Sequence, residues 1–536
     1  MSQINAVLAG MQTSLQYDHF KGALYPLTLD CVPVQKVFPI KSLVQIASDY
    51  IVKDATMTLS AIEVMPQEVF TVLLQQALEG NRDRAVDVLL TKWPLPTLSL
   101  KKFAPNIFTN LGLLHSQSEL IKVAKQGLRY TTCIAHNFLE TLKRKCDTRL
   151  KVVDISGYPT AEVITYYLAT HCMLAHNEAR QNMMIRKYEE AVKLLPENEA
   201  CARERFTTDQ SLPDDNFVVK LDVFISSEAS LYELCKALKV SGFQESTLKL
   251  IVNKLDATCL GAGKVEILLE QLNPELLHGL SLKFNSINSE ELSKLCPLLR
   301  TLTNLTILDL SGNMINLSVA ASDACVNFTD TLGSLGHLVR LDLSNNIVRG
   351  NLRRVLSAVV QPLQYLSLEG CGLSPVDIAY LSVSHHSASV CELLLSNNNL
   401  RQSLSSLMAL LRNLKTSLKL IQLENCSFSD ENCSMLSESM KRLTSVVYLD
   451  LQDNLFSRNN VYQLGVSLAC LETLQYLRVS YPTDSYHDDP EVQNQSQKEF
   501  VVMLGELIYR EKQRLHQNEK TLSVIFCHLP HVHVQI

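Results

Sequence analysis

The segment Gly261-Ala262-Gly263-Lys264 is the part of this sequence that could bind a phosphate. Glycine-rich loops hold phosphate groups through backbone N–H groups, and a following lysine balances their charge. The full frame GxxxxGK[ST] is absent, and Val265 stands where a metal-binding hydroxyl would be needed. We therefore interpret the segment as a loop that precedes a helix.

Cysteines and histidines could bind a metal ion in two places, because CxxH and HCxxxH are spacings that can supply zinc ligands. At the first of these candidate sites, the CxxH motif at Cys133 and the HCxxxH motif at His171 are 34 residues apart in a helical context. This arrangement favours buried cysteines and surface histidines. At the second candidate site, near the C-terminus, a short strand or a tail explains the cysteine and histidines without a metal ion. The sequence also lacks a serine nucleophile elbow, an HExxH motif and a dinucleotide fingerprint. It therefore predicts no metal, no cofactor and no enzymatic activity. The candidate ligands are Cys133, His136, His171, Cys172 and His176, and then Cys527, His528, His531 and His533.

Composition limits the class of protein. The 536 residues are 46% hydrophobic and 19% charged, enough to bury a large core, and the net charge is −6, whereas nucleic-acid binders are usually basic. No apolar run is long enough to cross a membrane, and the N-terminus does not read as a secretory signal. The fifteen cysteines include no CxxC pair, which favours reduced thiols. We expect a cytoplasmic protein, with the nucleus as a second location, and no nucleic-acid or membrane partner.

The second half of the chain repeats the frame LxxLxLxxN/CxL. The copies start 28, 33, 25, 27, 28, 28 and 28 residues apart. In each copy the LxL leucines alternate into a core from a short strand, and the Asn or Cys caps backbone groups inside the coil. The rest of each copy is helical in pattern. The starts are Leu277, Leu305, Leu338, Leu363, Val390, Leu418, Val446 and Leu474, and the capping residues are Asn285, Asn313, Asn346, Cys371, Asn398, Cys426 and Asn454.

This period predicts an α/β fold. A strand and a full helix in about 28 residues is typical of the ribonuclease-inhibitor-like leucine-rich-repeat solenoid, a horseshoe whose repeats share one core. We expect a loose extension over residues 1–35, a helical N-terminal cap over 36–145 and an irregular cap and linker over 146–214. The repeats would occupy 215–482, and residues 483–536 would form a capping helix and tail. The apolar positions of that helix are Phe500, Val501, Leu504, Leu507 and Ile508.

The middle residue of each LxL faces the concave side of such a horseshoe. Asp309, Asp342 and Asp450 occupy this position in three repeats. An acidic strip with interleaved tyrosines suits a basic segment of a partner protein. The alternative is an ordinary solvated interior of a horseshoe, and the sequence leaves both open. The other members of the predicted surface are Tyr365, Glu369, Glu424, Tyr448 and Tyr476.

Several motifs of the N-terminal half resemble the PRAME and leucine-rich-repeat-containing protein 14 family. They are SLVQIASDYIV, the helix around MPQEVF and the segment WPL, followed by RLKVVDISG near residue 150; the tail YPTDSYHDDP is also similar. The resemblance covers the chain from about residue 36. It implies a substrate receptor of a cullin-2 RING ubiquitin ligase, with elongin B, elongin C and cullin-2 as partners beside a target protein.

In such receptors a short helix, the BC box, docks on elongin C. The resemblance assigns this role to Ser42, Leu43, Ala47 and Ile51, whose last three members share one helical face. It places a cullin-selecting box at Val64-Met65-Pro66. The alternative for the helix is a structural cap. The alternative for the whole protein is a non-catalytic inhibitor of a signalling kinase complex, the IκB kinase of the NF-κB pathway.

Overall fold

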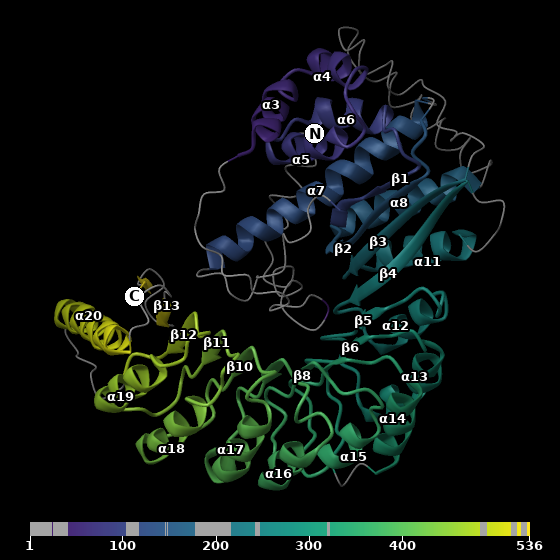
Figure 1. The fold of residues 1–536 in the computed structure, drawn as a ribbon. Coiled ribbons are helices and arrows are strands. Elements are labelled where there is room, and N and C mark those ends of the chain that lie inside the picture. The colour runs from purple at the N-terminus through teal and green to yellow at the C-terminus, as the bar shows by residue number, and fades with distance from the viewer. Residues whose placement is uncertain are drawn as a thin grey trace.

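The computed structural model describes residue 24 and ranges 41–102, 117–144, 148–176, 216–241, 247–318, 322–482, 490–515, 523–526 and 533–535, with residue 146. Within these ranges the chain forms a curved sheet with a helical unit at its N-terminal end (Figure 1). No helix of the described part is long and apolar enough to cross a membrane.

The N-terminal unit consists of short amphipathic helices that pack around their own apolar residues. They are α3 (Leu43–Ile51), α4 (Ala55–Ile62), α5 (Val69–Glu79) and α6 (Asp83–Thr91). Phe70 of α5 meets Trp93 edge to face, with ring centroids 6.2 Å apart. This unit confirms the predicted helical cap.

The helix α7 (Gln117–Lys143) lies between this cap and the sheet. On the cap side, Arg129 donates to the carbonyl of Leu78 at the end of α5, and Arg144 pairs with Asp87 of α6. On the sheet side, Phe138 packs against Phe217, with ring centroids 6.1 Å apart. The helix therefore forms a layer that contacts both parts.

The strands follow one another in chain order from β1 to β14 across one sheet. All neighbouring strands pair in parallel except β13 and β14, which are antiparallel. The strands are β1 (Thr97–Ser99), β2 (Val152–Pro159), β3 (Phe217–Ile225), β4 (Leu248–Ala257), β5 (Gly279–Ser281), β6 (Ile307–Asp309), β7 (Arg340–Asp342), β8 (Tyr365–Ser367), β9 (Glu392–Leu394), β10 (Leu420–Gln422), β11 (Tyr448–Asp450), β12 (Tyr476–Val479), β13 (Ser523–Phe526) and β14 (His533–Gln535). The parallel register confirms the predicted solenoid.

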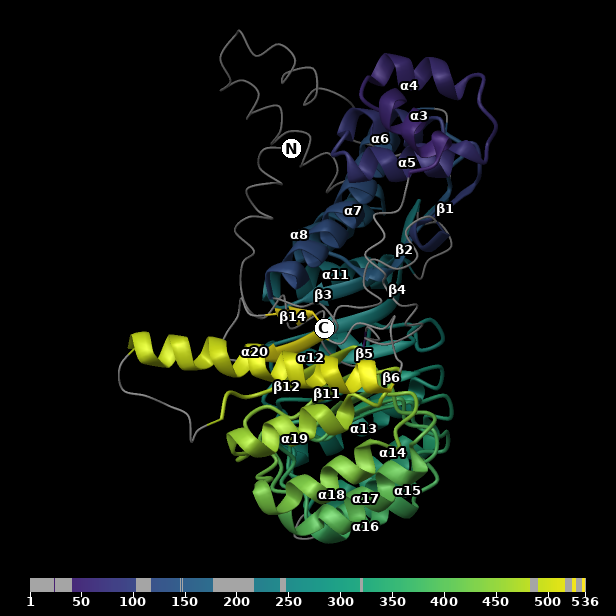
Figure 2. The ribbon, with the colours of Figure 1, turned by 60° about the vertical axis from the view of Figure 1, so that its left-hand side comes forward.

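A helix returns the chain from most strands to the next one and covers the outer, convex side of the sheet (Figures 1 and 2). Several of these helices start at a capping box, such as the one at Asn288 before α13. The helices are α8 (Glu162–His176), α11 (Glu228–Ser241), α12 (Ala262–Leu269), α13 (Ser289–Thr301), α14 (Ser322–Ser334), α15 (Leu352–Ser357), α16 (Pro375–Val383), α17 (Leu404–Asn413), α18 (Asp430–Met440) and α19 (Arg458–Leu468); 3₁₀ turns occupy Leu100–Lys102 and Arg401–Ser403.

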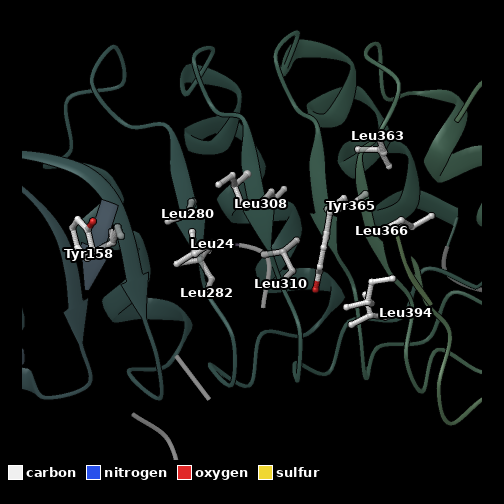
Figure 3. Close-up of a cluster of buried hydrophobic side chains, with 14 of the residues drawn as sticks. Leu24, Tyr158, Leu280, Leu282, Leu308, Leu310, Leu363, Tyr365, Leu366 and Leu394 are labelled. Carbon is white, nitrogen blue, oxygen red and sulfur yellow. The ribbon is translucent and has the colours of Figure 1, made fainter. Parts of the chain in front are cut away.

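The core is the stack of LxL leucines that the repeat frame predicts. Leu280, Leu308 and Leu341 are paired in register on adjacent strands and fully buried. Figure 3 shows the first two of them in this core. The capping Asn and Cys residues of the repeat frame, which we call the ladder residues, close the turns between repeats, as expected. For example, Asn398 Nδ2 donates to Leu368 O of the previous repeat at 2.8 Å. Each repeat thus satisfies backbone groups of its neighbour as well as sharing its core.

The C-terminal helix α20 (Pro490–Arg514) packs on α19, and the strands β13 and β14 that follow it extend the sheet beyond β12. Phe500, Val501, Leu504 and Ile508 are buried, and Phe500 stacks on Tyr462 of α19 with ring centroids 5.0 Å apart. The predicted amphipathic helix is therefore present, with strands of the sheet after it.

Two boundaries differ from the predicted ones. The sheet begins at β1, inside the predicted cap, and β2 and α8 form a regular strand–helix unit inside the predicted irregular region. The expected loose extension over residues 1–35 lies outside the described residues except for Leu24. That side chain is buried, and its carbonyl accepts a hydrogen bond of 2.6 Å from Lys254 Nζ on β4.

Candidate functional site

Helix α3 presents apolar side chains to solvent. Leu43 is 84% exposed, and Val44, Ile46 and Tyr50 are more than half exposed. Ala47 is exposed among them and adds little bulk. We call these five residues the α3 face. Single exposed apolar residues are ordinary on protein surfaces, but a whole helical face of them marks an interaction site.

Contacts of residues outside the α3 face hold the helix in place, among them the buried Ser48. Val52, at its C-terminal end, is buried, and Ile51 packs against the core. At the N-terminal end, Ser42 Oγ accepts from the N–H of Gln45, and Gln45 Oε1 accepts from the N–H of Ser42 at 2.8 Å. This capping box is worth about 1 kcal/mol and fixes where the helix starts.

The four residues of the predicted BC box therefore have different environments. Leu43 and Ala47 are exposed, Ser42 caps the helix, and Ile51 turns toward the protein. The spacing did not single out Val44, because apolar residues lie almost all round this helix. Which of them face solvent depends on how α3 packs against α5.

The predicted cullin-selecting segment lies in the turn between α4 and α5. Val64 is 84% exposed, and Pro66 is also exposed. Met65 between them packs against the core. The turn thus carries further exposed apolar residues on the same helical unit as the α3 face.

The acidic strip predicted for the concave face is largely closed to solvent. Asp309, Asp342 and Asp450 are buried, as are Tyr365 and Tyr448. This corrects the expectation of an open acidic surface at these five positions. The spacing of the repeats placed them on the strands, but neighbouring repeats supply side chains that cover and bind them.

Asp342 shows how these carboxylates are satisfied. Its Oδ2 accepts from the Tyr365 hydroxyl at 2.8 Å, and its Oδ1 accepts from the N–H of Ser344 at 2.9 Å. Burial, and then the nearby charge of Asp309, raises the pKa of Asp342 to about 7. Burial also raises the pKa of Asp309, whose Oδ2 accepts from Ser281 Oγ at 3.1 Å. These acids are therefore poor ligands for a basic segment.

Asp450 already has a basic partner within the chain. Its Oδ2 lies 2.6 Å from Arg478 Nη1 of the next repeat, and Arg478 also donates to the Tyr448 hydroxyl at 2.9 Å. Burial nevertheless raises the pKa of Asp450 to about 6, because desolvation outweighs the attraction of Arg478. An internal ion pair thus occupies this part of the predicted surface.

The remaining predicted residues of this surface are Glu369, Glu424 and Tyr476, which are half-buried. Burial, with Glu424 as a smaller cause, raises the pKa of Glu369. Binding of a basic segment here stays a prediction, and it now depends on these three residues.

Several residues considered for phosphate or metal binding make contacts within the protein. Lys264 pairs with Glu228 and lies in the first turn of α12, which begins at Ala262. Only Gly261 of the segment that we interpreted as a loop precedes the helix. Cys133 Sγ contacts Asp83 at 3.4 Å, and His171 packs on Tyr167 with centroids 4.2 Å apart. Among the described residues no group of three or more possible ligands lies together. The second candidate group, from Cys527 to His533, lies outside the residues whose side chains are described.

Comparison with known proteins assigns this architecture to a family. The PRAME C-terminal domain matches residues 219–533, and the PRAME N-terminal domain matches residues 40–128. The chain belongs to the PRAME family. The first match contains the helices α3 to α6 and β1, and the second contains the sheet from β3 onward. The strand–helix unit of β2 and α8 lies between the two matches.

Members of the PRAME family align with most of the chain. Leucine-rich repeat-containing protein 14 of Xenopus laevis is 26% identical and covers 84% of this chain and 89% of its own. The human protein of the same name is 24% identical, covering 80% and 85%. Oogenesin-3 of Mus musculus is 21% identical, covering 89% of both chains. A PRAME family leucine-rich-repeat protein is consistent with a protein-binding role.

Solved structures of leucine-rich-repeat proteins also match. LegL7 of Legionella pneumophila covers 53% of this chain and 85% of its own, with 19% identity and a TM-score of 0.32. LIC12759 of Leptospira interrogans covers 69% and 72%, with 15% identity and a TM-score of 0.28.

Proposed function

We propose that this PRAME family protein is the substrate receptor of a cullin-2 RING ubiquitin ligase. In this proposal the α3 face docks on elongin C of the elongin B–elongin C pair, the turn at Val64 contributes to cullin-2 selection, and the repeats hold the target protein. The chain itself performs no covalent step.

The exposure of the α3 face carries the proposal. A helix that served only as a structural cap would bury its Leu43, because a buried leucine is what stabilises such a cap. Leu43 is instead 84% exposed at the first position of a helix that is fixed from its other side. An amphipathic helix that offers a leucine and a small residue one turn later suits docking into an apolar groove.

Binding of the purified full chain to the elongin B–elongin C complex tests the proposal by calorimetry. The wild-type chain is expected to bind, and Leu43→Ser combined with Ala47→Asp is expected to abolish binding. Burial of one leucine in a groove contributes about 2 kcal/mol, so Leu43→Ser alone should weaken binding about 30-fold. Both positions are exposed, so the melting temperature should not change.

Val383→Ser is the matched control, because Val383 is an equally exposed apolar residue on α16. It should bind like the wild type. A second arm uses Val64→Asp, which should weaken recruitment of cullin-2 and leave elongin binding intact. Failure of the wild-type chain to bind elongin B–elongin C would overturn the proposal, as would a Leu43→Ser variant that loses stability and not binding.

A further inference from the structure

One backbone position has the same unusual conformation in eight successive repeats. The residue just before each ladder position, or its equivalent in the first of these repeats, has a positive φ, a conformation that glycine, asparagine and aspartate adopt most readily. Phe284 has φ 57° and Cys259 has φ 59°, although neither side chain favours it. Strain of this kind persists where the surrounding structure imposes it, and it clusters at functional sites. The eight residues are Cys259, Phe284, Gly312, Asn345, Gly370, Asn397, Asn425 and Asp453.

The conformation places the ring of Phe284 on the surface of the loop after β5. The ring is 41% exposed and lies over Gly312 of the next repeat. A Cβ on Gly312 would come within 2.3 Å of Phe284 Cε1, so a residue with a side chain would displace the ring. The neighbouring repeat thus leaves room for an aromatic ring that the core does not use.

Two further apolar side chains are exposed on the loops of the next two repeats. Met314 and Ile347 each follow a ladder asparagine, and they are 62% and 52% exposed. The N–H of Met314 donates to Ile287 O, and the N–H of Ile347 donates to Ile315 O, both at 2.9 Å. These bonds join the loops of consecutive repeats. We call Phe284, Met314 and Ile347 the rim patch; it lies where the strands β5, β6 and β7 turn toward α13, α14 and α15 (Figure 1).

Basic side chains follow Ile347 closely in the same repeat. Arg349, Arg353 and Arg354 lie in and before α15 and are exposed. Within the described part of the chain, none of the three has a salt bridge, although the whole chain carries a net charge of −6. The carboxylate of Asp377, nearby, accepts from the N–H groups of Gly350 and Leu352.

The acidic groups in the first turn of α13 are engaged. Glu290 pairs with Lys294 at 2.7 Å, and Glu291 accepts from the N–H of Asn288 in a capping box. In these repeats the arginines remain available to a partner, whereas Glu290 and Glu291 are engaged. The same repeats carry the three exposed apolar residues of the rim patch.

We propose that the rim patch and the three arginines dock an acidic, amphipathic segment of another protein. Its apolar side chains would cover Phe284, Met314 and Ile347, and its carboxylates would pair with the arginines. Charge complementarity favours this occupant over a basic one, and the apolar patch favours a peptide over a nucleic acid, whose phosphates would use only the arginines. The inference concerns the repeats alone and does not depend on docking by α3.

Fluorescence anisotropy of a short labelled peptide tests the inference on the full chain. The probe carries glutamate with leucine and phenylalanine at helical spacing. One comparison peptide replaces glutamate by lysine, a second replaces the apolar residues by serine, and a single-stranded oligonucleotide is the third. The wild-type chain should bind the first probe at least about tenfold more tightly than each of the three.

Substitutions then locate the site. Met314→Ser with Ile347→Ser, and separately Arg353→Glu with Arg354→Glu, should each weaken binding of the acidic probe about tenfold or more. Leu455→Ser is the matched control, because Leu455 follows the ladder residue Asn454 in the same way and is 61% exposed. It should bind like the wild type.

Cys259 offers a readout that does not depend on any substitution. The pairing of Lys254 with Gly279 places Cys259 beside Phe284 on adjacent repeats, and its side chain is exposed. The acidic probe should slow alkylation of Cys259 several-fold. The inference is overturned if the lysine peptide or the oligonucleotide binds as tightly as the acidic probe, if Met314→Ser with Ile347→Ser behaves like Leu455→Ser, or if Cys259 is not protected.

Discussion

Replacing Asp342 by asparagine should stabilise the repeats at alkaline pH. An unfolded aspartate has a pKa of about 3.9, whereas burial and Asp309 raise the folded value to about 7. At pH values between these two pKa values, the folded state therefore holds a proton that the unfolded state has lost. Stability from this group is fully present below about pH 3.9 and is lost as the pH rises through about 7.

The size of the effect follows from the two pKa values. A difference of about three pH units corresponds to about 4 kcal/mol of stability lost by the wild type at about pH 8. The asparagine side chain would keep the shape without the charge, but one of the two bonds that the carboxylate accepts must be rearranged. The Tyr365 hydroxyl, which donates to Asp342 Oδ2, can turn and accept from the amide instead. After about 1 kcal/mol for this change, we expect a gain of about 2–3 kcal/mol.

Urea unfolding followed by far-ultraviolet circular dichroism measures this gain, because the single tryptophan, Trp93, lies in the N-terminal cap and does not report on the repeats. The midpoint of Asp342→Asn should exceed that of the wild type at about pH 8 and approach it at about pH 5. Asp330→Asn, at an exposed position of α14, is the control and should change neither. If Asp342→Asn destabilises equally at both pH values, the carboxylate is ionised in the folded protein and our reasoning fails.

Three further predictions follow from single residues. Asn398→Ala removes the amide that donates to three carbonyls and accepts from one N–H of its own and the previous repeat. It should lower stability by about 2–4 kcal/mol in urea unfolding, with loss of cooperativity as a second sign. Cys371 is buried, and burial raises the pKa of its thiol to about 12. Iodoacetamide should therefore modify the exposed Cys259 and leave Cys371 unmodified until the protein is denatured, whereas a disulfide at Cys371 would contradict its packing. Phe284→Asn places a residue suited to positive φ at a strained position and should raise the free energy of unfolding by about 1 kcal/mol while weakening binding of the acidic probe; a loss of stability would mean that the ring supports the core.

The repeat frame predicted the solenoid because one physical requirement recurs in it. Every LxL pair must bury two leucines, and every ladder Asn or Cys must satisfy carbonyls inside the coil, as Asn398 and Cys371 do. The strand β1 escaped this reasoning, and β2 was recognised only as the strand half of a repeat in RLKVVDISG, because neither strand is followed by a ladder residue of that frame. Their position depends on packing with α7, which no local pattern of residues encodes.

The candidate site was less predictable for the same reason. The spacing placed Ser42, Leu43 and Ala47 on one short helix, but only its packing on α5 decides that Leu43 is exposed and Ile51 is not. On the concave face, the burial of Asp450 depends on Arg478, which lies one repeat away in space. A signal for the rim patch is present in the sequence: most repeats have asparagine, glycine or aspartate where Phe284 stands.

The layer formed by α7 has a consequence for the geometry of ubiquitin transfer under the proposed function. At about 1.5 Å per residue this helix is about 40 Å long, and it contacts the cap on one side and the sheet on the other. The α3 face therefore cannot swing freely relative to the horseshoe. A bound target would be held at a set distance from the catalytic end of the ligase, so that the position of a lysine on the target, more than its surrounding sequence, would decide whether it is modified.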